Sequence, residues 1–559
     1  MIPEPDFAEA PLRDPAKIMR LSRMGAFHPT RLSFMRTLIR RLNSEQAKVT
    51  RPVWEMSDEG YGHAVYSVDV SGFTYSLVAF STPLAPENRT DRVIAEAWDS
   101  TFVLFDGVPT TEDLDRIEGN APRQEAGRFT AKELVLSRAN KSVRLFAHVV
   151  DRLAAGEQPD ADQIASIGYL MRTTAVYGNG KFGIADRVWF AGRPSMSGPF
   201  RAEMLTVWLI RGFTHDLVEH VAKARNPDAA TLDPALKRHL GIGNSTGLGM
   251  APFLVNHPIL LSNWMTVRET AFARVRAIET PTAAAVARFK DLLTRAQAHV
   301  ADWNVPDVRQ QARTDRLREE LQEIAARPLA AAYPWADLAE ASDQWSEEAQ
   351  EILVSLLLEP YGDLIDGLED CMSSDTETRL EPGMTIAELS AVLADKFDWA
   401  LAVNFDEPEQ QRKFWYASEE KLEPRIGDRF EEDGADLEEP LDIARDAQRL
   451  AAALKDADGS EIVARFLIAR PELRRITRRV QSIRWAPYSE IQDNLIAADC
   501  LPIDMLRCKL SFFGASKFDP KSDLWTRVTL FQGAPVFEDI SAADADDWSF
   551  PVMGEVLAG

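Results

Sequence analysis

The stretch Gly241-Ile242-Gly243-Asn244-Ser245-Thr246-Gly247-Leu248-Gly249 combines four glycines with three small polar residues. Glycine allows positive φ angles and lets a ligand approach the backbone closely. The following Asn256-His257-Pro258 predicts a helix start, with a capping side chain and a proline at the first helical position. Because unpaired amides converge at such a helix end, we interpret 241–249 as an anion-binding loop. A tight connection between two helices would need the same glycines, and this alternative stays open.

Two known phosphate-binding motifs do not fit this stretch. A dinucleotide fingerprint requires a strand before its glycines, and a P-loop requires Lys-Ser/Thr directly after them. Here residues 234–240 predict a short helix before the stretch, and Met250-Ala251-Pro252 follows it. The prediction is therefore a generic ligand site. It consists of the backbone between Gly243 and Gly247, the amide side chain of Asn244 and the hydroxyls of Ser245 and Thr246.

A second segment with glycines spans residues 172–183. Its pattern predicts the end of a helix followed by a loop that carries Asn179 and Lys181. Lysine offers a mobile ammonium group with three donors, which suits a phosphate or a carboxylate. Arg172 and Arg193 would add guanidinium donors for the same anion. The alternative is an ordinary helix C-terminus closed by glycine, with Lys181 in solvent. If both segments are loops, we expect them to line one cleft.

Three residues are candidates for proton transfer. In the predicted helix over 201–224, His215 and Glu219 are four residues apart and therefore share a face. An imidazole beside a carboxylate can act as a general base near neutral pH. His257 is the other candidate, because it lies next to the glycine-rich stretch. The alternative for each is an ordinary ion pair or hydrogen bond. No metal site is predicted, since His215 and His220 are not at the spacing of a zinc helix.

Composition and charge narrow the class of protein. The chain has 559 residues, 45% of them hydrophobic, including 13 tryptophans and 27 phenylalanines, which predicts a folded chain with a large core. A net charge of −24 disfavours nucleic acid as a partner. The three cysteines suggest reduced thiols, and no apolar run is long enough for a transmembrane helix. With no signal peptide evident, we expect a cytoplasmic protein. Cofactor and oligomeric state are not indicated.

The hydrophobic periodicity predicts an α+β fold that is predominantly helical, with one small antiparallel sheet in each half around a helical body. Strands are expected at 61–81, with a turn at Val70-Ser71-Gly72, and at 101–106, 398–405, 413–418 and 525–531. Helices are expected near 15–25, 30–47, 131–155, 161–176, 201–224, 258–278, 282–302, 306–326, 344–358, 440–456, 459–469 and 471–484.

We divide the chain into an N-terminal helical segment (1–50), an α+β region with the glycine-rich loops (51–330), a helical connector (331–395) and a C-terminal α+β region (396–559). The C-terminal region shows a weak sequence similarity to the N-terminal half. Arg128-Phe129 and a later Asp151-Arg152-Leu153-Ala154-Ala155 resemble Arg429-Phe430 and Gln448-Arg449-Leu450-Ala451-Ala452. A distant duplication explains this similarity, and so does chance resemblance between helical sequences.

The leading hypothesis is a cytoplasmic enzyme that acts on a small anionic molecule bearing a carboxylate or a phosphate. Its reaction class, whether lyase, hydrolase or transferase, stays open. Residues 243–247 would bind the anion, and His257, or His215 with Glu219, would move a proton. The alternative is a non-catalytic interaction protein. In that case the basic helices 31–42 and 470–484 would bind an acidic partner or a membrane surface.

Overall fold

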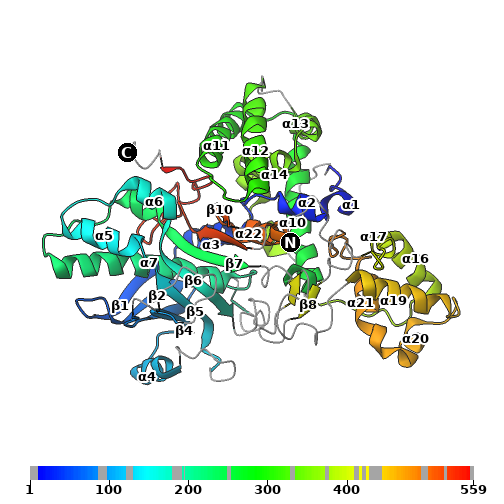
Figure 1. Ribbon diagram of the computed structural model, residues 1–559, viewed down its shortest axis with the longest axis horizontal. Helices are drawn as coiled ribbons and strands as arrows, with labels where there is room; N and C mark the ends of the chain where they lie inside the picture. Colours follow the sequence, from blue (N-terminus) through cyan, green and yellow to red (C-terminus); the bar gives the residue numbers. More distant parts are fainter. Residues whose placement is uncertain are drawn as a thin grey trace.

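The computed structural model describes residues 10–85, 88, 97–120, 130–178, 192–193, 195–247, 253–327, 334–371, 377–407, 415–417, 424–426, 443–492, 502–521 and 525–553. A large β-sheet with helices on it forms one half of the molecule in Figure 1. A bundle of helices stands above it, and a separate group of helices, α16 to α21, lies at the right. None of the helices in the described ranges has the length and apolar character that a membrane crossing requires.

Within the described residues, nine strands form one mixed sheet in the order β1-β2-β3-β4-β5-β6-β7-β11-β10. Strands β6 and β7 run parallel, and the other neighbouring pairs run antiparallel. The strands are β1 (Lys48–Met56), β2 (Gly62–Val70), β3 (Phe73–Ser81), β4 (Ser100–Asp106), β5 (Glu133–Lys141), β6 (Tyr169–Gly178), β7 (Gly241–Gly247), β10 (Lys517–Pro520) and β11 (Trp525–Leu530). A separate pair joins β8 (Trp415–Ala417) to β9 (Pro424–Ile426).

The expectation of a small separate sheet in each half is wrong, because the late strands join the early ones. Strand β11 pairs with β7 from Trp525 opposite Gly247 to Leu530 opposite Ile242. On its other side, β7 pairs with β6. The glycine-rich stretch is therefore the strand that connects strands β1–β6 to β11 and β10, and not a loop over 241–247.

The glycines of β7 serve close packing between strands. A Cβ atom at Gly243 would lie 2.6 Å from the ring of Tyr169, and one at Gly241 would lie 2.3 Å from the carbonyl oxygen of Leu530. Glycine inside a strand commonly marks such a close approach. These contacts come from residues far away in the sequence, so the glycine pattern alone resembled a loop.

Two further strands were expected to be helical. The segment Glu133–Lys141 is β5, and only the following Leu145–Ala154 is a helix. Similarly, Tyr169–Gly178 is β6, after the short helix Ala161–Ile167. Both strands are central in the sheet, where the strand pairing outweighs an ambiguous apolar pattern. The opposite error occurs at Asp398–Leu401, which is helical although a strand was expected.

The predicted hairpin at Val70-Ser71-Gly72 is confirmed. Strands β2 and β3 pair over their full length, from Gly62 opposite Ser81 to Val70 opposite Phe73. The two connecting residues, Ser71 and Gly72, have φ angles of 51° and 79°. Two positive φ angles are the mark of the tight hairpin turn that matches the twist of the strands.

Most of the predicted helices are confirmed, with shifted ends. The helices are α1 (Pro15–Ile18), α2 (Leu21–Gly25), α3 (Phe34–Ser44), α4 (Thr111–Asn120), α5 (Leu145–Ala154), α6 (Ala161–Ile167), α7 (Arg201–Arg225), α8 (Pro234–His239), α9 (Phe253–Asn256), α10 (Pro258–Arg276), α11 (Ala283–Ala301), α12 (Val308–Ala326), α13 (Trp335–Ala341), α14 (Glu347–Leu358), α15 (Gly362–Ile365), α16 (Ile386–Lys396), α17 (Asp398–Leu401), α19 (Ile443–Lys455), α20 (Val463–Ala469), α21 (Arg474–Ser482) and α22 (Pro502–Phe513).

The sheet has an apolar core on each face. On one face, residues such as Tyr66 and Leu104 join the main core with α3 and α7. On the opposite face, Val65 and Val103 pack with Ile117 of α4. Neighbouring residues of one strand thus serve different cores, as the period of two in a strand requires. Helices α10 to α15 enclose a further core of their own.

Candidate functional site

The structure brings the two glycine-containing segments together, but as paired strands. Arg172 of β6 lies opposite Gly243 of β7, and Thr173 lies opposite Asn244. The amide of Asn244 donates a hydrogen bond of 3.1 Å to the hydroxyl of Thr173, and that hydroxyl donates one of 3.3 Å to the carbonyl of Gly243. Arg172 is buried. Strands β6 and β7 are therefore internal elements of the sheet.

Gly243 pairs with β6 and with β11, so the expectation of a free loop amide is corrected at this residue. Ser245, Thr246 and Gly247 pair with β11. A strand with neighbours on both sides directs its backbone groups to those neighbours. Ser245 lies opposite Arg527 of β11, and Thr246 lies opposite Thr526. A role of these residues in ligand binding stays a prediction. Asn179 and Lys181 lie outside the described residues.

Arg193 has a partner in the chain itself. Its Nη1 and Nη2 atoms donate hydrogen bonds of 2.8 and 2.9 Å to the two carboxylate oxygens of Asp106 at the end of β4. Its guanidinium also lies over the ring of Phe73, at 5.1 Å. The hydrogen bonds to Asp106 raise the pKa of Arg193 above its usual value. This bidentate geometry is that of a strong structural ion pair.

His215 and Glu219 share helix α7 as predicted, but each is engaged elsewhere. Burial lowers the pKa of His215 well below its usual value, and the charges of Arg211 and Lys237 lower it further. The carboxylate of Glu219 accepts a 3.0 Å hydrogen bond from the backbone of Leu232 and lies 2.8 Å from Nζ of Lys237. His215 thus has a hydrogen bond with the backbone of Leu240, and Glu219 contacts Leu232 and Lys237. A catalytic role of this pair stays a prediction.

His257 lies at the N-terminal cap position of α10, and Pro258 occupies the first turn as predicted. The cap makes no side-chain hydrogen bond to the helix, so the expected capping side chain is not found. The imidazole of His257 is partly exposed.

A cavity of about 530 Å³ lies beside α3 and has the size of a small-molecule site. Its walls are α3, the turn around Asp366–Asp370 and the segment around Ser541–Asp546. Three guanidiniums line it, those of Arg31, Arg40 and Arg41. Four carboxylates also line it, those of Asp366, Glu369, Asp370 and Asp546. Sequence analysis found the arginines as a basic helix but could not find the cavity, because its walls come from three distant parts of the chain.

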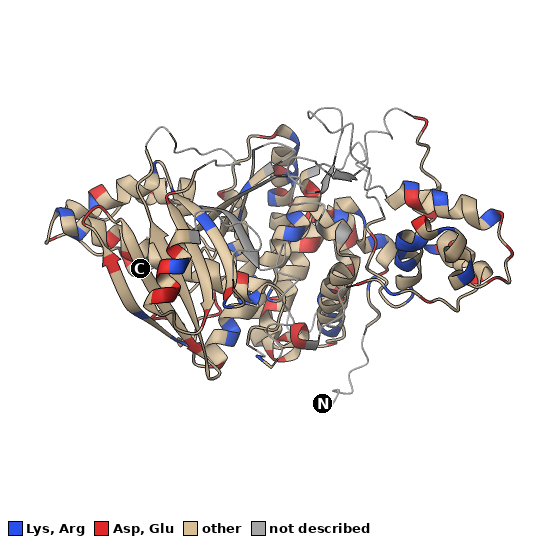
Figure 2. Cartoon of the chain, turned by 90° about the horizontal axis from the view of Figure 1, so that it is seen from below, with Lys and Arg blue, Asp and Glu red and all other residues tan. Residues whose placement is uncertain are grey.

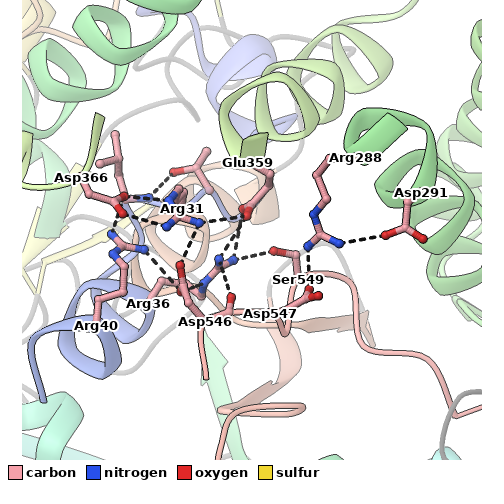
Figure 3. Close-up of polar contacts among 12 residues, drawn as sticks. Arg31, Arg36, Arg40, Arg288, Asp291, Glu359, Asp366, Asp546, Asp547 and Ser549 are labelled. Carbon is pink, nitrogen blue, oxygen red and sulfur yellow. Dashed lines mark hydrogen bonds and ion pairs between the residues drawn. The ribbon is translucent and has the colours of Figure 1, made fainter. Parts of the chain in front are cut away.

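Most charges around this cavity form close pairs, as Figure 3 shows. Arg31 donates two hydrogen bonds of 2.7 Å to Asp366. Arg36 donates two of 3.1 Å to Glu359 and one of 2.8 Å to Asp546. Burial raises the pKa of Asp546, but Arg36 and Arg40 outweigh this effect and leave the pKa below its usual value. The cluster therefore fixes the C-terminal segment against α3.

Arg40 is the exception in this cluster. Its Nη1 lies 3.5 Å from Asp546, and its Nη2 lies 3.5 Å from Asp366 and 4.0 Å from Glu369. Both nitrogens are buried and neither has a hydrogen-bond partner among the described residues. Burial lowers the pKa of Arg40, with opposition from Asp546 and Asp366. A guanidinium normally approaches a carboxylate more closely than this.

The basic helices of the alternative hypothesis have internal partners too. Besides the α3 arginines above, Arg479 of α21 is buried and pairs with Glu490, and its Nη1 donates a 2.7 Å hydrogen bond to the carbonyl of Val255. Arg474 and Arg475 of the same helix are exposed. Figure 2 shows both signs of charge distributed over the described parts of the chain. Binding of an acidic partner or a membrane surface stays a prediction.

Within the described ranges, no group of three or more His, Cys, Asp and Glu side chains is placed to hold a metal ion. Comparisons of the chain with protein-family models, with curated proteins and with solved structures gave no match.

Proposed function

We propose that this protein binds a small molecule bearing a carboxylate or a phosphate, and that the cavity beside α3 is the binding site. The observation that carries the proposal is Arg40, which lines the cavity and has no hydrogen-bond partner for either Nη atom among the described residues. An anion in the cavity would supply those partners. Because both nitrogens are buried, the anion would reach them after a rotation about the last side-chain torsions.

The energetics support a ligand role for Arg40. A buried polar group without a hydrogen bond costs on the order of 1–3 kcal/mol. Arg36, one helical turn away, satisfies its donors with Glu359, Asp546 and Ser549. A residue that costs stability in the free protein is characteristic of a binding site, where the partner arrives with the ligand.

This proposal keeps the ligand class expected from the sequence and moves its site. Strand β7 offers few free backbone donors, whereas the cavity offers space and guanidiniums. An enzymatic step on the bound molecule stays a further prediction, since His215 and Glu219 have other partners.

Calorimetric titration with inorganic phosphate, acetate and citrate tests the proposal. We expect at least one of these anions to bind the wild-type protein, and Arg40→Met to weaken that binding about ten-fold or more through loss of a charged hydrogen bond. The matched control is Arg449→Met, because this arginine is 71% exposed on α19, outside the cavity. Equal binding by the wild type and Arg40→Met contradicts the proposal. So does a wild-type protein that binds none of these anions and none of the amino acids titrated below.

A further inference from the structure

We propose that the ligand of the α3 cavity is a zwitterion of the α-amino-acid type, with its carboxylate on Arg40 and its ammonium group on Glu369. This inference rests on the proposed function above and names the chemistry of the same site. It adds a second charged group to the ligand and a residue to receive it.

The charges of the cavity wall favour a ligand that carries both signs. Three guanidiniums line the cavity against four carboxylates. A ligand with negative charge alone would face these carboxylates as well as Arg40, and like charges at close range repel. A zwitterion has no net charge and satisfies both kinds of group.

Among the described residues, Glu369 is the wall carboxylate that has no arginine nitrogen within hydrogen-bond distance. Asp366 and Asp546 have arginine nitrogens at 2.7 and 2.8 Å, and Asp370 has Nη2 of Arg201 at 2.6 Å. Glu369 accepts one hydrogen bond of 3.1 Å through Oε2 from the backbone of Gly367. Its Oε1 has Nη2 of Arg40 at 4.0 Å, which is beyond hydrogen-bond range.

The positions of Arg40 and Glu369 match the head group of an amino acid. In an α-amino acid the ammonium and the carboxylate are attached to the same carbon, so the protein groups that receive them must be neighbours. Nη2 of Arg40 and Oε1 of Glu369 form an ion pair at 4.0 Å, which is too long for a hydrogen bond. An inserted head group would give the guanidinium an acceptor and the carboxylate a donor. Thr37, Asn43 and Ser44 also line the cavity and suit a polar side chain.

The test compares ligands that differ by one charged group. The wild-type protein is titrated with the proteinogenic L-amino acids. For the amino acid that binds best, the titration is repeated with the counterpart lacking the amino group and the counterpart lacking the carboxylate. For L-glutamine these are glutaramate and 4-aminobutanamide. We expect each loss to weaken binding about ten-fold or more.

Two variants test which protein side chain contacts the ammonium group of the ligand and which contacts its carboxylate. Glu369→Gln should remove the preference for the amino acid over its deaminated counterpart, and Arg40→Met should weaken both. The matched control is Glu377→Gln, because this carboxylate is 87% exposed and lies outside the cavity. Its preference for the amino acid should equal that of the wild type.

The failures can be told apart. If phosphate or a simple carboxylate binds through Arg40 and no amino acid binds better than its deaminated counterpart, the zwitterion is wrong and the proposed function stands. If the preference survives in Glu369→Gln, the assignment of the ammonium group is wrong. If no anion and no amino acid binds, both proposals fail.

Discussion

Gly243 lies so close to Tyr169 that a Cβ atom on this glycine would be 2.6 Å from the aromatic ring. Strand β7 can therefore sit between β6 and β11 only with glycine at this position, or with a displacement of Tyr169. The contact ties a local sequence feature to the pairing that completes the sheet.

The first prediction concerns this contact. Gly243→Ala should lower the free energy of unfolding by about 1–3 kcal/mol, because an added methyl group in a packed site forces its neighbours apart. The measurement is urea unfolding followed by tryptophan fluorescence. Gly119→Ala is the matched control, since a Cβ atom there has no neighbour within 4 Å and the position lies in helix α4. This control should be unchanged or slightly more stable. An equal loss in both variants contradicts the packing argument.

The second prediction separates two arginines of α3. Arg36→Met should lower the free energy of unfolding by about 3 kcal/mol or more, because it leaves the buried carboxylate of Glu359 without its paired hydrogen bonds. Arg40→Met should lower it far less in the absence of ligand, because the lost ion pairs at 3.5–4.0 Å are offset by removal of a buried group whose Nη atoms have no hydrogen bond among the described residues. Chemical denaturation of both variants under one set of conditions measures this. A loss for Arg40→Met as large as that for Arg36→Met would mean that Arg40 is a structural residue.

The third prediction is a dependence of stability on pH. Burial and nearby cations lower the pKa of His239 from 6.5 to about 4 in the folded protein. The unfolded chain therefore takes up a proton first, so the free energy of unfolding falls as the pH drops from about 6.5 towards 4, by on the order of 2 kcal/mol. Above pH 6.5 the contribution is fully present.

Urea unfolding at several pH values measures this slope. His239→Gln should flatten it between pH 6.5 and 4 relative to the wild type. His63→Gln, at a partly exposed imidazole on β2, is the matched control for the loss of an imidazole. An identical slope in His239→Gln and the wild type rules out this histidine as a source of the dependence.

The fourth prediction concerns the buried pair of Arg479 and Glu490. Either single change, Arg479→Met or Glu490→Leu, should cost about 3–5 kcal/mol, because one buried charge is left without its partner. The double variant should be more stable than the sum of the single losses implies, since both charges are then absent. A double-mutant cycle by chemical denaturation provides the coupling energy. Strict additivity would show that the pair is not coupled.

Sequence reasoning located the elements whose pattern is local. The helix α7 and the hairpin at Ser71-Gly72 depend on residues close together in the chain, and both were predicted. Strand β7 was not, because its glycines are explained by Tyr169 and by the carbonyl of Leu530, which lie far from it in sequence. Central strands β5 and β6 resembled helices for a similar reason, since what stabilises them is their neighbours in the sheet.

In the candidate site, too, some features follow from local sequence and others depend on residues that are distant in the chain. The arginines of α3 are visible in the sequence as a basic helix. The positions of Asp366, Glu369 and Asp546 in the folded chain determine which arginine lacks hydrogen bonds. No pattern within α3 distinguishes Arg40 from Arg36.

The position of β7 also determines when the molecule can finish folding during synthesis. Its partner β11 is made almost three hundred residues later, at Trp525–Leu530. Until the ribosome has released that segment, the edge of β7 that pairs with β11 has no partner strand. Open strand edges promote association between chains. We expect nascent or prematurely terminated chains that stop before β11 to depend on chaperones, and the finished chain to close that edge by itself.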